Sequence, residues 1–135
     1  MVTKEDIESF LDRVTAEEQA DYAEVDDGMW VVRPGGALDT DVVVHYSPPV
    51  VVLRLKVMAL PADDGALAAL SKRLLQLNAT DLVHGSYGME ADSIVLTEAL
   101  ELSHLDYEEF LACYEGMTLA LASHLRELAP YREAH

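Results

Sequence analysis

The spacing of hydrophobic residues predicts three amphipathic helices. Apolar side chains recur at helical intervals over residues 3–14, 61–78 and 106–128, with polar residues between them. In the first of these segments Ile7, Phe10, Leu11 and Val14 fall on one face. Asn78 and Pro130 are suitable stops for the second and third helices. Each segment also begins near residues that favour helix N-caps, namely Thr3, Asp63 or Asp64, and Ser103 or Asp106.

Shorter runs of β-branched and alternating residues predict five to six strands between the helices. They cover residues 21–33, as a hairpin turning at 26–28, then 41–46, 50–59, 82–89 and 94–102. Gly28 is the residue best able to take a positive φ in the first turn. The resulting order, α-β-β-β-β-α-β-β-α, favours an α+β fold in which helices pack on one face of an antiparallel sheet. The length of 135 residues fits a single domain, residues 1–135.

Two strands differ in how their residues alternate. In the strand 50–59, hydrophobic residues on one face alternate with Arg54 and Lys56 on the other, which is typical of a sheet with one wetter side. In the strand 94–102 neither face is polar. One face carries Ile94, Leu96, Leu100 and Leu102, and the other carries Val95, Thr97 and Ala99. Such a strand is either central and covered on both sides, or buried in a subunit interface.

Composition narrows the classes of partner. Nine Lys and Arg residues against 25 Asp and Glu residues give a formal charge of −16, which argues against nucleic acid and anionic membrane as partners. The single cysteine, Cys113, excludes an internal disulfide and fits a reducing compartment. The N-terminal residues contain no apolar run of signal-peptide length, so we expect a cytoplasmic protein.

Residues able to do chemistry are present but do not form a recognisable motif. The five histidines, His45, His84, His104, His124 and His135, include no HxH or HxxxH pair, so no metal site is predicted. Acid pairs such as Asp26-Asp27 lie at predicted turns or helix starts. Neither glycine-rich segment carries a Walker lysine. Cys113 is expected to be a small buried hydrophobe. We therefore predict no catalytic residue and no cofactor.

Several segments resemble a known family. LLQLN, GSYGME, DSIVLTEALEL and the final helix that begins LDYEEFLACYE look like the YbjN family and the related CesT-type (Tir chaperone) class of type III secretion chaperones. The similarity covers most of residues 67–131. It implies the type III secretion chaperone-like fold. Members of that class are small, acidic, cytosolic homodimers that hold an extended segment of a secreted protein against hydrophobic patches and sheet edges.

The sequence and this resemblance together predict a non-enzymatic protein-binding module. The predicted partners are a second copy of the chain, through Ile94, Leu96, Leu100 and Leu102, and a client protein or peptide. Candidate client-binding residues are Trp30, Val32, Arg54 and Lys56, although core packing is the default expectation for Trp30. Two alternatives stay open. One is a small-molecule sensor or enzyme with a pocket between the sheet and the last helix, lined by Tyr87, Tyr114 and His84. The other is a dedicated single-partner regulator of the immunity-protein or antitoxin type.

Overall fold

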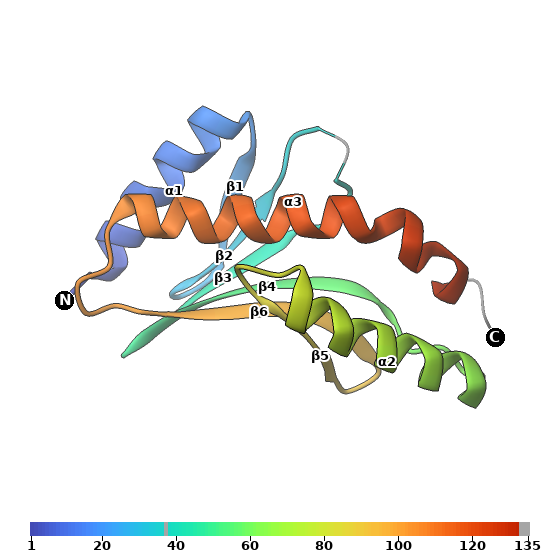
Figure 1. Ribbon diagram of the computed structural model, residues 1–135. Coiled ribbons are helices and arrows are strands. Elements are labelled where there is room, and N and C mark those ends of the chain that lie inside the picture. The colour runs from blue at the N-terminus through green and yellow to red at the C-terminus, as the bar shows by residue number, and fades with distance from the viewer. Residues whose placement is uncertain (37, 133–135) are drawn as a thin grey trace.

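The computed structural model describes residues 1–36 and 38–132 and confirms the predicted order of elements (Figure 1). The described part of the chain folds into one six-stranded antiparallel sheet and three helices. The elements are α1 (Lys4–Glu18), β1 (Asp21–Asp26), β2 (Met29–Arg33), β3 (Val42–Ser47), β4 (Val50–Ala59), α2 (Asp64–Thr80), β5 (Ser86–Glu90), β6 (Ser93–Glu101) and α3 (Tyr107–Arg132).

The strand order in the sheet is β1-β2-β3-β4-β6-β5. The first four strands follow one another as a meander, with tight turns between β1 and β2 and between β3 and β4 and a longer connection, residues 34–41, between β2 and β3. After α2 the chain returns so that β6, and not β5, pairs with β4, from Val50 opposite Glu101 to Ala59 opposite Ser93. The sheet therefore has two outer strands, β1 and β5, which come from opposite halves of the chain.

All three helix starts have the caps that the sequence favours. The Thr3 hydroxyl accepts a hydrogen bond from the Asp6 N–H, and the Asp6 carboxylate accepts one from the Thr3 N–H, which forms a capping box. Asp63 caps α2 by accepting from the Ala66 N–H at 2.7 Å, and Asp106 accepts from the Glu109 N–H at 2.8 Å. Such caps satisfy backbone donors that the first helical turn leaves free.

The helices run further than predicted, and one strand is shorter. α1 continues four residues past Val14 to Glu18, α2 ends at Thr80, and α3 continues through Pro130 to Arg132. A proline near the end of a helix removes one backbone bond and favours a bend, and the C-terminal part of α3 bends from its axis (Figure 1). β5 begins only at Ser86. Gly85 has a φ of +84°, which is not an extended conformation, so the strand cannot continue back through Gly85.

The two faces of the sheet have different environments. Helices α1 and α3 lie on the same side of the sheet, and α2 lies on that side beside β5 (Figure 1). α3, about 39 Å long at its 26 residues, covers much of this face. The side chains that point toward the helices form a continuous buried core, which includes Trp30, Val32, Val44, Leu53, Leu55, Tyr87, Ile94 and Leu96 from the strands and Ile7, Leu11, Leu70, Leu77, Phe110 and Met117 from the helices. We call the opposite side the open face.

Asn78 of α2 closes one edge of the sheet. Its side-chain amide donates to the Tyr87 carbonyl at 3.1 Å, and its carbonyl oxygen accepts from the Tyr87 N–H at 2.7 Å. These are backbone groups of β5 that point away from β6, so the side chain takes the place of a further strand. The sequence predicts Asn78 only as a helix stop; its structural role is to seal the edge of β5.

Replacing Asn78 with alanine should destabilise the protein by about 1–3 kcal/mol, because it leaves two partly buried backbone groups of Tyr87 without partners. Urea unfolding followed by circular dichroism measures this change. The matched control is Gln76→Ala in the same helix, where the side chain is exposed and contacts only Arg73. Equal stability of the two variants would contradict the sealing role of Asn78.

Candidate protein-binding surfaces

The open face carries an apolar centre with no helix over it. Alternation along the strands places Val31, Val43 and Val52 on this face, and each is half-buried by its neighbours within the sheet. Val31 lies opposite Val43, and Val43 lies opposite Arg54 across the next pair of strands. A sheet face with valines at its centre and a few charged residues around them resembles the apolar core and polar rim of a protein–protein interface.

A shallow hollow lies where the open face meets β1. It has a volume of about 260 Å³ and is lined by residues of β1 and β2: Asp21, Tyr22, Ala23, Val25, Val31 and Arg33. Val25 is 57% exposed, which is unusual for a valine in a strand. The hollow can accept an aliphatic side chain, and its rim offers both an acidic group, Asp21, and a basic one, Arg33.

The two outer strands differ in access. β5 is sealed by Asn78, whereas five of the six residues of β1 are exposed. β1 also carries three carboxylates, Asp21, Glu24 and Asp26, and charged side chains on an edge strand discourage pairing between identical edges. Lys4 from α1 pairs with Glu24 at 2.9 Å and neutralises part of this charge. β1 is therefore an accessible edge with a strong preference against self-pairing.

The structure separates the four residues predicted as a dimer interface. Ile94, Leu96 and Leu102 are 0% exposed and pack in the core of their own chain, because their face of β6 is the one that the helices cover. These three side chains have no surface left to offer a second copy. Leu100 lies on the same helix-covered face, where it is half-buried and packs against the core, whereas Thr97 and Ala99 lie on the open face of the strand. A dimer contact along β6 stays a prediction, and it would involve these more accessible residues.

The predicted client-binding residues also divide between the two faces. Trp30 and Val32 are fully buried on the helix side, so they serve the core. Arg54 and Lys56 lie on the open face, where Arg54 is half-buried and Lys56 is exposed. Arg54 reaches across β6 to Glu90 of β5, with 3.2 Å between Nη2 and Oε2. Arg54 and Lys56 therefore place two positive charges on the open face, near its valines.

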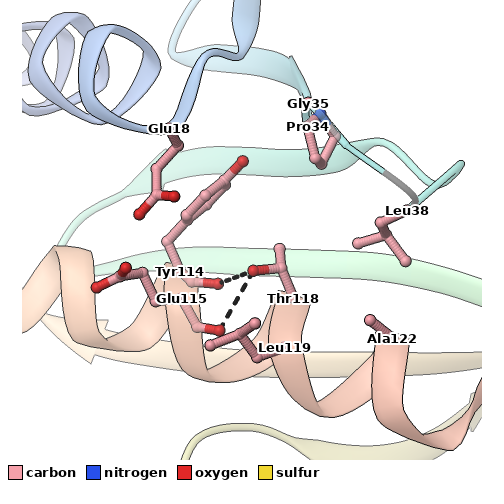
Figure 2. A pocket seen from close by; sticks show the side chains of 9 residues that line it. All are labelled: Glu18, Pro34, Gly35, Leu38, Tyr114, Glu115, Thr118, Leu119 and Ala122. Carbon is pink, nitrogen blue, oxygen red and sulfur yellow. Dashed lines mark hydrogen bonds between the residues drawn. The ribbon is translucent and has the colours of Figure 1, made fainter.

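A second hollow, of about 210 Å³, lies between the end of α1, the loop after β2 and the middle of α3 (Figure 2). Its apolar walls include Leu38, Tyr114 and Leu119, and the Glu18 and Glu115 carboxyl groups stand at one end. A hydrogen bond with Glu115 raises the pKa of Glu18, and burial and charge repulsion act in the same direction. This hollow favours a positively charged group with an apolar stem.

The small-molecule hypothesis names Tyr87, Tyr114 and His84 as candidate lining residues of a pocket between the sheet and the last helix, and these three do not line the second hollow together. Tyr114 lines the second hollow, but Tyr87 and His84 do not. The Tyr87 hydroxyl instead lies 2.7 Å from His124 Nδ1, and His124 Nε2 lies 3.2 Å from Asp81. Burial raises the pKa of Tyr87. This network joins the C-cap of α2 to β5 and α3, so its evident role is to hold these elements together.

These features define a class of protein: a type III secretion chaperone-like fold, with one face of its sheet open. The CesT_Tir_1 family model matches residues 2–134, and the chain belongs to this family. The family assignment confirms the resemblance that the sequence predicts.

Solved structures share the fold at low sequence identity. A chain of the heterodimeric ExoU–SpcU complex from the type III secretion system of Pseudomonas aeruginosa has a TM-score of 0.61 and 16% identity, over 91% of this chain and 98% of that chain. YbjN from E. coli has a TM-score of 0.62 and 14% identity, over 93% and 92%. A chain of the HopA1–SchA chaperone–effector complex has a TM-score of 0.57 and 14% identity, over 95% and 94%.

No curated protein matches the chain. Among the described residues, no helix has the length and hydrophobicity needed to span a membrane.

The raised pKa of Glu18 gives a pH-dependent prediction. The shared proton stabilises the fold fully below the ordinary glutamate pKa of 4.5, and this contribution is lost as the pH rises through the raised value. Glu18→Gln should therefore raise the melting temperature relative to the wild type at neutral pH, with no gain below pH 4.5.

The control for Glu18→Gln is Glu101→Gln, an exposed position on β6 that removes the same charge. Melting curves of the three proteins across this pH range measure the effect. A similar gain in both variants would trace it to the net charge of the chain rather than to the pair of carboxyl groups.

Proposed function

We propose that this protein is a non-enzymatic, chaperone-like homodimer that holds an extended segment of a partner protein. The observation that carries the proposal is the open face of the sheet beside an accessible edge strand, with Val25 exposed and a hollow next to it. The family supports a partner-binding role, since similar folds occur in chaperone–effector complexes. The compartment we propose is the cytoplasm, where the single cysteine would stay reduced.

The proposed binding mode follows from what an extended segment presents. Its backbone has unpaired N–H and C=O groups, which the free edge of β1 can satisfy as a further strand would. Its alternate side chains point toward the sheet face, where the hollow lined by Ala23, Val25 and Val31 can take one of them. The charge of −16 keeps such an exposed apolar surface from driving non-specific aggregation, and it favours a client segment with a positive charge.

A homodimer would place two such surfaces in one assembly, so that one client could be held at two points with increased avidity. We place the contact between copies on the open face of β6, at Thr97 and Ala99. The acidic β1 edge is a poor choice for that contact because identical carboxylates would face each other. Self-association and client binding would then use different strands, β6 and β1.

The client surface is tested by paired variants with matched exposure. A partner captured from the host is purified and titrated against the wild type, Val25→Glu and Leu75→Glu. Val25 is 57% exposed on β1, and Leu75 is 69% exposed on α2, on the side of the helices. We expect Val25→Glu to weaken binding at least about tenfold, because a charge enters the apolar contact, and Leu75→Glu to bind like the wild type.

The opposite pattern, with loss of binding in Leu75→Glu and none in Val25→Glu, would contradict the proposal. It would transfer the client site to the helix side of the molecule. Equal binding by both variants and the wild type would exclude the hollow next to β1 as a contact.

The oligomeric state is tested separately by light scattering after size exclusion. At tens of micromolar the wild type should show twice the chain mass of 14.9 kDa. Ala99→Glu should shift it toward the single-chain mass while its circular dichroism spectrum stays unchanged, because this side chain is exposed on the open face. Leu75→Glu is again the control. A wild-type protein with the mass of one chain at this concentration would refute the dimer.

A further inference from the structure

Three side chains that can bind metal meet on the helix side of the sheet. His84 comes from the loop before β5, Glu98 from β6 and Cys113 from the second turn of α3. One ligand atom from each lies within 4.8 Å of the others. No sequence motif marks this cluster, because 14 residues separate the first two and a further 15 separate the last two. Only the crossing of the loop, β6 and α3 brings them together.

Other contacts fix the orientation of the first two groups. The Gly85 N–H donates to Glu98 Oε1 at 3.2 Å, and Glu98 Oε2 lies 3.3 Å from His84 Nδ1. The imidazole rests directly on α3 at Gly116, where an added Cβ would lie 2.8 Å from His84 Cδ2. Glycine inside a helix lowers stability by about 1 kcal/mol relative to alanine. At position 116 the missing side chain leaves the space in which the His84 ring contacts the helix.

The third group is the Cys113 thiol, which forms no strong hydrogen bond within the described part of the chain. Cys113 is fully buried, and its Sγ lies 3.6 Å from the Met117 Sδ, which is a weak contact. Burial chiefly, together with the nearby Glu98 carboxylate, raises the pKa of Cys113, so in the absence of a cation it stays a thiol. A divalent cation bound to the sulfur, the carboxylate and the imidazole would displace that proton and offset the negative charge.

From this geometry we propose that His84, Glu98 and Cys113 form a binding site for Zn²⁺. Zinc takes sulfur, nitrogen and carboxylate ligands in tetrahedral geometry, with Zn–N and Zn–O bonds of about 2.0–2.2 Å, which puts neighbouring ligand atoms roughly 3.3 Å apart. His84 Nδ1 and Glu98 Oε2 already have this separation. The side chains of His84 and Glu98 are 32% and 24% exposed, which provides a route for the ion and leaves a fourth position for water.

The site lies apart from the proposed client surface. Glu98 is on the helix side of β6, whereas the hollow beside β1 lies on the open face at the other end of the sheet. A bound ion would tie the loop before β5 to β6 and α3, the part of the fold that holds the sealed edge. The inference therefore stands or fails independently of the proposed function.

Cobalt substitution tests the site directly. Co²⁺ is added to the untagged, reduced wild-type protein, and absorption is recorded in the near ultraviolet and the visible range. We expect one equivalent to produce a thiolate-to-cobalt charge-transfer band and the visible bands of tetrahedral cobalt, and one equivalent of Zn²⁺ to remove both. Cys113→Ser should lose the charge-transfer band, and Glu98→Gln should weaken Co²⁺ binding at least about tenfold.

His45→Ala is the matched control, since His45 lies on the open face and should bind Co²⁺ like the wild type. Melting curves with and without Zn²⁺ provide a second readout that does not depend on the cysteine band. Zn²⁺ should raise the melting temperature of the wild type and His45→Ala but not of Glu98→Gln. No charge-transfer band in the wild type, or a band that persists in Cys113→Ser, would overturn the assignment.

Discussion

The hydrogen-bonded pairing of β4 with β6 is the interaction on which the rest of the structure depends. It joins the N-terminal meander to the segment after α2, and it puts β5 rather than β6 at the edge of the sheet. Because residues in a strand alternate between faces, the same pairing decides which side chains meet the helices. Leu53 and Leu55 of β4 turn inward with Leu96, while Arg54 and Lys56 turn outward. A shift of one residue would exchange these two sets.

One consequence is an asymmetric molecule. Every helix of the described chain packs on one face, so the valines on the other face have no intramolecular cover. The two edges are also unequal, since Asn78 seals β5, whereas β1 has acidic side chains and a register irregularity at Val25 but stays exposed. A large negative charge makes this exposure tolerable in water. The open face, the accessible edge and the charge are thus three aspects of one arrangement, in which apolar surface is exposed and protected from aggregation.

Local sequence is enough to predict the element order, the cap at Thr3 and the burial of Cys113, and it narrows the cap of the last helix to Ser103 or Asp106, because each depends on neighbours in sequence. It is not enough to predict what β6 contacts. Ile94 and Leu96 are apolar on a strand whose other face is also apolar, and nothing local distinguishes a helix cover from a second chain. The role of Asn78 and the meeting of His84, Glu98 and Cys113 depend on the crossing of distant segments, which residue spacing does not encode.

The account rests on the claim that a partner occupies the open side of the sheet at β1. Hydrogen–deuterium exchange of the protein, alone and saturated with a purified partner, measures this most directly, because pairing with a new strand protects backbone amides. The account predicts increased protection in β1 and in the neighbouring residues of β2, with little change in α2. Protection confined to α2 and α3, with β1 exchanging as in the free protein, would contradict it.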